Sequence, residues 1–186
     1  MNKFKNAPNI KIPSTNGETF ELKKIKNKFL ILYFYPKDDT PGCTLESKDF
    51  SKLNSMINKK NTVVYGISKD SIESHLRFKK KNKISFELLS DDKKKVHKLY
   101  GVWGLKTFMG KKFMGTIRST FFIKNGIVTK VWTNVRVKDH AKEVFDEFKG
   151  SVTTETFTGL PENITLYLGH KAFLTAIKSV PLASLI

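Results

Sequence analysis

The apolar run Phe29–Tyr35, FLILYFY, constrains the fold of this chain more than any other segment. Its residues are all aliphatic or aromatic, which is typical of a central strand that is buried on both faces of a sheet. The segment 61–68, NTVVYGIS, has a similar character and predicts a second buried strand. Between the two runs, Phe50, Leu53 and Ile57 recur at helical spacing. These segments predict a sheet with helices packed against it.

The remaining patterns extend this arrangement in both directions. Asn16-Gly17 marks a hairpin between two short extended segments near the start of the chain. After the second strand, 70–82 predicts an amphipathic helix with Ile72, Leu76 and Phe78 facing inward. A short strand over 85–90 and a helix that ends before Gly101 follow; 119–123 and 127–132 then form a hairpin around Asn125-Gly126, and 138–150 is a helix capped by Gly150.

This order of elements predicts an α/β fold with a mixed central sheet, an N-terminal β-hairpin and flanking helices. A thioredoxin-like fold satisfies it. Small flavodoxin-like folds are the alternative, but their strands would all be parallel. The predicted last strands form an antiparallel hairpin, which favours the thioredoxin-like arrangement.

The composition changes abruptly after Gly150. The segment 151–186 contains only two lysines, Lys171 and Lys178, balanced by two acidic residues, so the net charge lies entirely in the first part. Its apolar patches are too short to build a core of their own. We therefore expect one domain over 1–150 and a C-terminal extension of unknown role over 151–186.

The chain carries a formal net charge of +17, with 34 basic residues against 17 acidic ones. Such a balance raises the alternative of a lysine-rich module that binds nucleic acid. The lysines, however, are spread along most of the chain, and we expect no specific nucleic-acid binding. Only Arg77, Arg118 and Arg136 are arginines, so the planar guanidinium group is expected to matter at one or more of these positions.

Membrane and export signals are not expected. No apolar run is long enough to cross a membrane, and the N-terminal segment has no apolar stretch that could act as a signal peptide. The single cysteine, Cys43, cannot form an internal disulfide, so the cytoplasm is the expected compartment.

Cys43 is either an inert buried thiol or a reactive one, and its neighbours favour the second reading. Thr40 is a good N-cap residue, and Pro41 suits the first position of a helix. Cys43 then falls in the first helical turn, where free backbone N–H groups and the helix dipole favour an anion. The thiolate is the reactive form of cysteine.

The chemistry open to this thiol is limited by position 46. Disulfide exchange of the thioredoxin type needs a second cysteine there, and the residue is Glu46. A single thiolate can still attack a peroxide, which yields a sulfenic acid and water or an alcohol.

The motif Pro36-x-x-x-Thr40-x-x-Cys43 matches the active-site signature of the peroxiredoxins. The segments YFYPKDDTPGCT, LLSDDKKKVHKLYGVWGLKTFMGKKFMGTIRSTFFI and VKDHAKEV resemble the bacterioferritin comigratory protein, or peroxiredoxin Q, subfamily. The resemblance runs from about Asn6 to Lys149.

This resemblance implies a role for each matching residue. Cys43 is the expected peroxidatic cysteine, and the Thr40 hydroxyl is expected to bond the thiolate and the bound peroxide. Pro36 is expected to shield the thiolate, and Arg118 to stabilise it and polarise the peroxide. Arg77 and Arg136 are expected to have surface or packing roles.

The chain departs from many members of the subfamily at Lys48, where they carry a resolving cysteine. The sequence therefore predicts a one-cysteine enzyme whose sulfenic acid is reduced by an external thiol: thioredoxin, glutaredoxin or glutathione. The expected substrates are hydrogen peroxide and organic hydroperoxides. The subfamily is often monomeric, so a monomer is expected, with a dimer as the alternative. The alternative function is a non-catalytic redox sensor or holdase on the same fold.

Other candidate constellations are weaker. No cofactor is expected, and the four histidines (His75, His97, His140 and His170) lack metal-ligand spacing. The pairs Asp38-Asp39 and Asp91-Asp92 are interpreted as capping residues near loops and helix starts. The loop GVWGLKTFMGKKF, with Trp103 and Phe108, either lines the peroxide entrance or packs against the core.

Overall fold

The structure of the chain is a computed structural model that describes residues 6–27, 29–59, 61–108 and 110–157. It divides into two compact units, Met1–Asp146 and Glu147–Ile186. The first unit contains all the predicted site residues. Most of the predicted extension, from 158 onward, lies outside the described residues.

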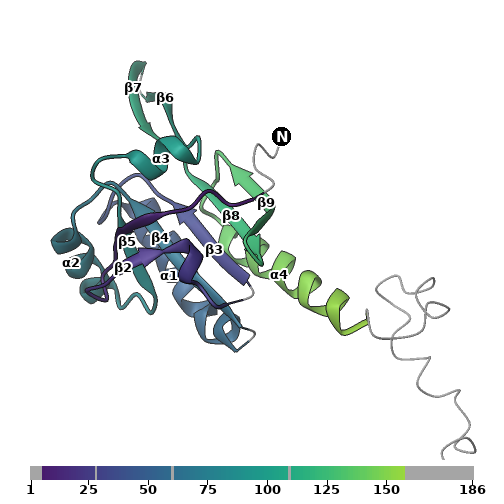
Figure 1. Cartoon of the computed structure of the whole chain (residues 1–186). Coiled ribbons are helices and arrows are strands. Elements are labelled where there is room, and N and C mark those ends of the chain that lie inside the picture. The colour runs from purple at the N-terminus through teal and green to yellow at the C-terminus, as the bar shows by residue number, and fades with distance from the viewer. Residues whose placement is uncertain (1–5, 28, 60, 109, 158–186) are drawn as a thin grey trace, which may run out of the picture. The chain divides into compact units, whose positions relative to one another are not determined.

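The first unit is built on a five-stranded mixed sheet in the order β5-β4-β3-β8-β9 (Figure 1). Its strands β3, β4 and β5 run parallel, whereas β8 and β9 run antiparallel to their neighbours. The bounds are β3 Phe29–Phe34, β4 Thr62–Ser68, β5 Glu87–Ser90, β8 Ser119–Lys124 and β9 Ile127–Thr133. The predicted mixed sheet is confirmed.

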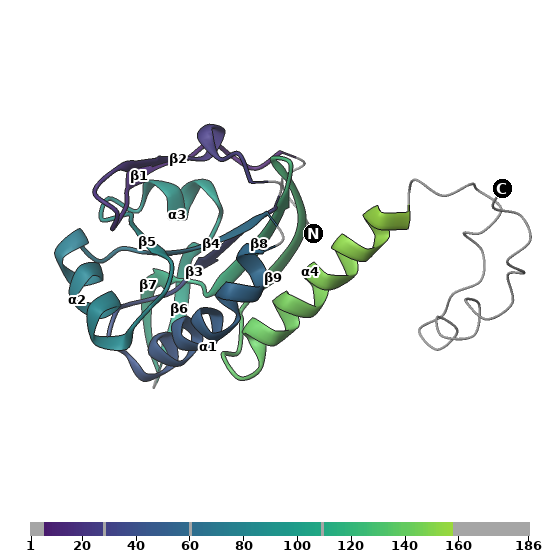
Figure 2. The same ribbon diagram turned by 90° about the horizontal axis from the view of Figure 1, so that it is seen from below.

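Helices and a hairpin cover the two faces of this sheet. In Figure 2, α1 (Pro41–Asn58), α2 (Ile72–Asn82) and the start of α4 (His140–Phe157) lie on one side. On the other side lie α3 (Lys95–Leu99), β1 (Lys11–Pro13) and β2 (Thr19–Glu21), which is followed by the short 3-10 helix η1 (Leu22–Lys24). The predicted N-terminal hairpin is therefore present, with β1 paired antiparallel to β2.

Strand β3 explains why its sequence is continuously apolar. All six of its residues are buried. Leu30, Leu32 and Phe34 belong to the core beneath β1, β2 and α3. On the opposite face the Tyr33 ring stacks on Phe50 of α1, with ring centroids 4.8 Å apart. Burial on both faces leaves no position in the strand for a polar side chain.

Two sequence predictions about the elements are wrong, and a third, about the buried face of α2, follows below. The predicted loop after Gly101 is a second hairpin, formed by β6 (Trp103–Phe108) and β7 (Lys111–Thr116). Gly150 does not cap α4, which continues to Phe157.

On α2, the predicted inward residue Leu76 is 46% exposed. His75 is fully buried in its place, because hydrogen bonds satisfy its ring nitrogens. Phe78 is buried as predicted.

Candidate active site

The loop after β3 delivers Cys43 to the start of α1. Thr40 has an extended backbone (φ −91°, ψ 147°), and Pro41 begins the helix, as predicted. The Thr40 hydroxyl does not cap the helix but donates to the Lys37 carbonyl oxygen at 3.0 Å. Cys43 therefore occupies the first turn, where unpaired backbone N–H groups favour a negative charge.

The pairing of β3 with β8 brings Arg118 to this turn. Phe34 at the end of β3 lies opposite Ser119 at the start of β8. Arg118 directly precedes Ser119, so the sheet register places it beside the loop that leads into α1. Its Nη2 donates to the Cys43 sulfur at 3.2 Å. Two residues that are 75 positions apart in the sequence thus form one site.

Cys43 is only 1% exposed, so its sulfur contacts the protein interior rather than bulk water. A cation stabilises an anion more strongly in such surroundings, because the low local dielectric constant screens the interaction less. The Arg118 guanidinium is the cation that meets this sulfur.

Glu46 completes the charged cluster, and the sequence analysis missed it. It lies three residues after Cys43 on the same face of α1, is 1% exposed and accepts a hydrogen bond from Arg118 Nη1. Burial raises the pKa of Glu46 to about 7, although the Arg118 charge and hydrogen bond act to lower it. The signal that could have found it is the (i, i+3) spacing from Cys43, which places both side chains on one helix face.

Arg118 is therefore shared between two acidic partners. Burial acts to lower the pKa of Arg118, but the Glu46 carboxylate and the Cys43 sulfur raise it above its ordinary value. The guanidinium stays charged and is held by one hydrogen bond at each end. Its planar fork fits this double contact.

A buried polar network fixes the loop between β3 and α1. The Asp38 carboxylate accepts from the Tyr35 hydroxyl at 2.7 Å and the Ser74 hydroxyl at 2.7 Å, and it lies 2.9 Å from His75 Nδ1. Burial acts to raise the pKa of Asp38, but the hydrogen bonds from His75, Tyr35 and Ser74 lower it below its usual range. Asp38 is thus a buried anchor between the loop and α2, and the interpretation as a capping residue is wrong.

The second carboxylate pair differs from the first. Asp91 accepts the backbone N–H of His97 at 2.8 Å, which satisfies a donor in the first turn of α3, as the capping interpretation expects. The same carboxylate also lies 2.7 Å from His97 Nδ1. Asp92 accepts the backbone N–H of Lys93.

The other predicted site residues have simpler surroundings. Pro36 is half-buried in the loop between β3 and α1, and Arg77 and Arg136 are exposed. Trp103 lies on β6, with its ring 6.1 Å from that of His97. The Phe108 side chain and His170 lie outside what the structure describes. In the described ranges, no three His, Cys, Asp or Glu side chains gather where they could hold a metal ion.

The comparison with known proteins decides the family. The AhpC/TSA family profile matches residues 5–131. The chain belongs to the AhpC/TSA family of peroxiredoxins. Peroxiredoxin Bcp of Bacillus subtilis is 44% identical over 144 residues, which cover 77% of this chain and 92% of that protein. Peroxiredoxin Bcp of Escherichia coli is 35% identical over 144 residues, which again cover 77% of this chain and 92% of that protein.

Solved structures of peroxiredoxins agree with this assignment. A structure of Xanthomonas campestris peroxiredoxin Q has a TM-score of 0.72 and 34% identity, and covers 76% of this chain and 91% of its own. A structure of the X. campestris bacterioferritin comigratory protein, described for alkyl peroxide reduction activity, has the same TM-score and coverage. The predicted peroxiredoxin Q resemblance, the thioredoxin-like fold and the enzyme class, a thiol-dependent peroxidase, are confirmed.

The described part of this peroxiredoxin contains one free cysteine, Cys43. The full sequence has no other, and position 48 is lysine. A peroxide substrate and a thiol reductant are the general reactants of the family. None of the helices within the described ranges combines the length and the apolar character that crossing a membrane requires.

Proposed function

We propose that this peroxiredoxin reduces hydrogen peroxide and small organic hydroperoxides at Cys43 by way of a sulfenic acid. The observation that carries the proposal is the 3.2 Å contact between Arg118 Nη2 and the Cys43 sulfur in the first turn of α1. An arginine in this position favours the thiolate, the nucleophilic form.

The reaction follows from these groups. The Cys43 thiolate attacks one peroxide oxygen, the O–O bond breaks, and the departing oxygen takes a proton to leave as water or an alcohol. Negative charge develops on that oxygen, and the Arg118 fork is the donor placed to stabilise it. Thr40 is assigned the hydrogen bond to the bound peroxide, and Pro36 the shielding of the thiolate from water.

For Thr40 this role requires its side chain to rotate to another rotamer. Its hydroxyl donates to the Lys37 carbonyl in the structure described here. A bound peroxide would offer it an alternative acceptor one turn from Cys43. Organic hydroperoxides are included among the substrates because the X. campestris relative is described for alkyl peroxide reduction.

The second half of the cycle needs an external thiol. One thiol condenses with the sulfenic acid and releases water, and a second thiol releases Cys43 and leaves as a disulfide. Thioredoxin, glutaredoxin and glutathione are the candidate reductants. A monomer suffices for this chemistry, with a dimer as the alternative state. The cytoplasm is the compartment that we infer, because it keeps thiols reduced.

Peroxide consumption with each reductant in turn tests the proposal. The wild-type protein should turn over with at least one of the three, whereas Cys43→Ser should retain no more than a few per cent of that rate with any of them, because serine is a poor nucleophile. Substantial turnover by the Cys43→Ser variant would show that the reaction does not take place at this residue.

A further inference from the structure

The loop between β3 and α1 lies at the edge of the sheet where the parallel strands β3, β4 and β5 end. Parallel strands have their carboxyl ends at one edge, so the segments that follow them are neighbours there. The first residue of the loop, Tyr35, donates its backbone N–H to the Ile67 carbonyl of β4 at 3.0 Å. Asp70 follows the end of β4 at the same edge and is therefore close to the loop that leads to Cys43.

One peptide group of this loop is held on both sides. Asp70 Oδ2 accepts the backbone N–H of Asp38 at 2.8 Å. The carbonyl of the same peptide group, that of Lys37, accepts the Thr40 hydroxyl at 3.0 Å. A trans peptide group is planar, and its N–H and C=O point in opposite directions, so the direction of one fixes the direction of the other. Asp70 is therefore connected to Thr40 through a single peptide group.

Asp70 is itself held by the ends of two strands. The Ser68 hydroxyl donates to Asp70 Oδ2 at 2.7 Å and accepts the backbone N–H of Asp70 at 3.0 Å. The Ser90 hydroxyl donates to the Asp70 carbonyl oxygen at 2.7 Å. The N-cap of α2 is the next residue, Ser71, whose Oγ accepts the backbone N–H of Ser74 at 3.3 Å. The Asp70 carboxylate thus serves the active-site loop rather than the helix that follows it.

A second anchor fixes the position of Asp38 but not the direction of its peptide group. The Asp38 carboxylate lies 2.9 Å from His75 Nδ1, and His75 Nε2 lies 3.3 Å from the Leu89 carbonyl oxygen. Asp38 and His75 are both buried, and buried polar groups are stable only with hydrogen-bond partners. The backbone bonds on either side of the peptide group can still rotate while the carboxylate stays in place. The hydrogen bond to Asp70 removes that freedom.

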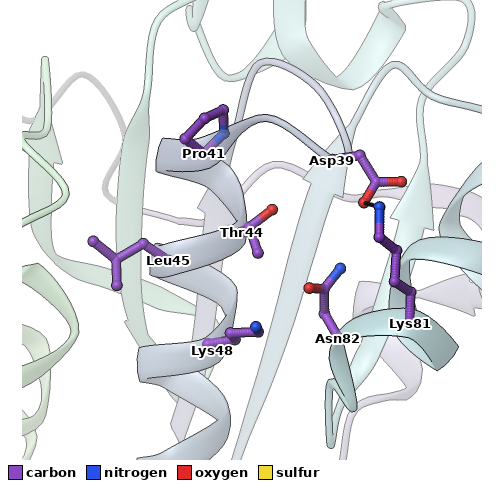
Figure 3. A pocket seen from close by; sticks show the side chains of 7 residues that line it. All are labelled: Asp39, Pro41, Thr44, Leu45, Lys48, Lys81 and Asn82. Carbon is purple, nitrogen blue, oxygen red and sulfur yellow. Dashed lines mark hydrogen bonds and ion pairs between the residues drawn. The ribbon is translucent and has the colours of Figure 1, made fainter.

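The outer side of the loop makes a weaker contact. Asp39 forms an ion pair with Lys81 of α2, with 2.9 Å between Oδ1 and Nζ (Figure 3). Both side chains are exposed, and exposed ion pairs contribute little to stability. The buried contacts of Asp38 therefore determine where the loop lies, and the Asp39–Lys81 pair offers a control on the same loop.

We propose that Asp70 is a positioning residue for peroxide attack on Cys43. This inference rests on the proposed function, in which the Thr40 hydroxyl binds the peroxide. The Thr40 carbonyl accepts the backbone N–H of Thr44 at 2.9 Å, so Thr40 joins the loop to the first turn of α1. Its hydroxyl needs only a change of rotamer, and the rotated hydroxyl reaches the same place each time only if the backbone is fixed. Groups that are fixed before the reaction need no ordering during it, which raises the rate.

The test is the second-order rate of Cys43 oxidation by hydrogen peroxide. Asp70→Ala should slow it about tenfold, less than the roughly hundredfold that a misplacement of about 1 Å can cost. Asp70→Asn should recover most of the rate, because its amide oxygen can still accept the backbone N–H of Asp38. Lys81→Gln removes the exposed ion pair on the same loop and should leave the rate unchanged. No loss in Asp70→Ala, or an equal loss in Asp70→Asn, overturns the inference.

Two further measurements distinguish positioning from a general loss of structure. Alkylation of Cys43 by iodoacetamide does not use the Thr40 hydroxyl, so Asp70→Ala should not slow it. Thr40→Val removes the hydroxyl but keeps the shape of the side chain, and this hydroxyl does not cap α1. In the Thr40→Val background, Asp70→Ala should slow peroxide attack by no more than about twofold, because the two residues act through one hydroxyl. Equal losses with both reagents, or in both backgrounds, overturn the inference.

Failure of the proposed function gives a different result. If peroxide does not oxidise the wild type, or if Thr40→Val reacts as fast as the wild type, the proposed reaction or the role of Thr40 in it is wrong, and Asp70 has no positioning role. If the wild type is oxidised and Thr40→Val is slow while Asp70→Ala is not, the proposed function stands and only the role of Asp70 is wrong.

Discussion

At the scale of single residues, Arg118 links the reactive sulfur to the buried carboxylate of Glu46. Each end of the guanidinium makes one of these contacts. A lysine at this position has the charge but not the planar fork, so it cannot hold both partners in a fixed geometry. The contact with Glu46 therefore orients the guanidinium beside the Cys43 sulfur.

We predict that Arg118→Lys slows peroxide attack on Cys43 about tenfold or more, which corresponds to about 1.4 kcal/mol of activation free energy. The measurement is the second-order rate of Cys43 oxidation by hydrogen peroxide. Arg136→Lys, at an exposed position, serves as the control. An unchanged rate in Arg118→Lys would show that the charge alone is enough.

The burial of Glu46 predicts that the stability of the protein depends on pH. Burial raises the pKa of Glu46 to about 7, above its value in the unfolded chain. From the unfolded value up to about 7, the folded state holds a proton that the unfolded state releases, so the stability from this group is lost as pH rises. A glutamine at position 46 mimics the protonated carboxyl group at every pH.

We therefore predict that the free energy of unfolding of the wild type falls relative to that of Glu46→Gln between pH 5 and 8. The relative fall should reach up to about 3 kcal/mol. Urea unfolding of both proteins at several pH values measures it. A relative stability that rises with pH would mean that the ion pair with Arg118 outweighs the burial of the carboxylate.

The site was only partly predictable at this scale. Cys43, Thr40 and Pro36 form a local motif, and Arg118 stands out in a chain that otherwise uses lysine. Glu46 has no such mark, because a glutamate on an amphipathic helix ordinarily faces water. Only the burial of that helix face and the arrival of Arg118 from a distant strand give Glu46 its role.

At the scale of elements, the predictions succeeded where burial dictates the sequence. Strand β3 is buried on both faces and is apolar throughout. The β6–β7 hairpin was missed because its side chains Leu105 and Met114 are exposed, so no alternation marks it. The helix α4 passes through Gly150 because a glycine in a helix costs only about 1 kcal/mol relative to alanine.

The packing of β4 against β3 leaves no room beside Gly66. A Cβ atom there would lie 2.6 Å from the Tyr33 hydroxyl oxygen and 2.8 Å from Leu88 Cδ2. Tyr33 cannot withdraw easily, because it is fully buried and its hydroxyl lies 2.9 Å from Ser47 Oγ on α1. Tyr33 thus connects the space beside Gly66 to the helix that carries Cys43.

We predict that Gly66→Ala lowers the free energy of unfolding by about 1 to 3 kcal/mol through overpacking. Thermal unfolding of the variant measures this loss. Tyr33→Phe removes the hydroxyl oxygen and its contact with Ser47, so the ring, whose Cζ would lie 2.7 Å from the added Cβ, is freer to shift. The double variant should therefore lose less than the sum of the two single variants. Strict additivity would place the strain elsewhere.

At the scale of the whole molecule, the net charge lies in residues 1–150, and we propose that 151–186 is an extension of the peroxiredoxin part. The family and the mixed sheet were predictable, because the motif and the alternation of elements lie in local sequence. The strand order depends on pairings between distant segments, and the contact of Cys43 with Arg118 was expected only from the family resemblance. The predicted boundary at Gly150 falls inside α4, which continues to Phe157.

We propose that the part after α4 is dispensable for the chemistry at Cys43. Truncation after Phe157 keeps the whole helix and removes the remaining residues of the extension. The rate of peroxide attack, the Tm and the size-exclusion mass, corrected for length, should stay close to those of the full chain. A large fall in Tm, or a change from dimer to monomer, would show that the extension is structural.

The central claim is that Cys43 reacts with peroxide and becomes a sulfenic acid within one chain. The most direct measurement is the intact mass of the protein after one equivalent of hydrogen peroxide without reductant, with dimedone added to trap the product. We predict one dimedone adduct per chain, mapped to Cys43, and further oxidation of Cys43 when excess peroxide replaces dimedone. The buried position of Cys43 hinders contact between two chains. Absence of the adduct, or rapid and complete conversion to a disulfide-linked dimer, would contradict the account.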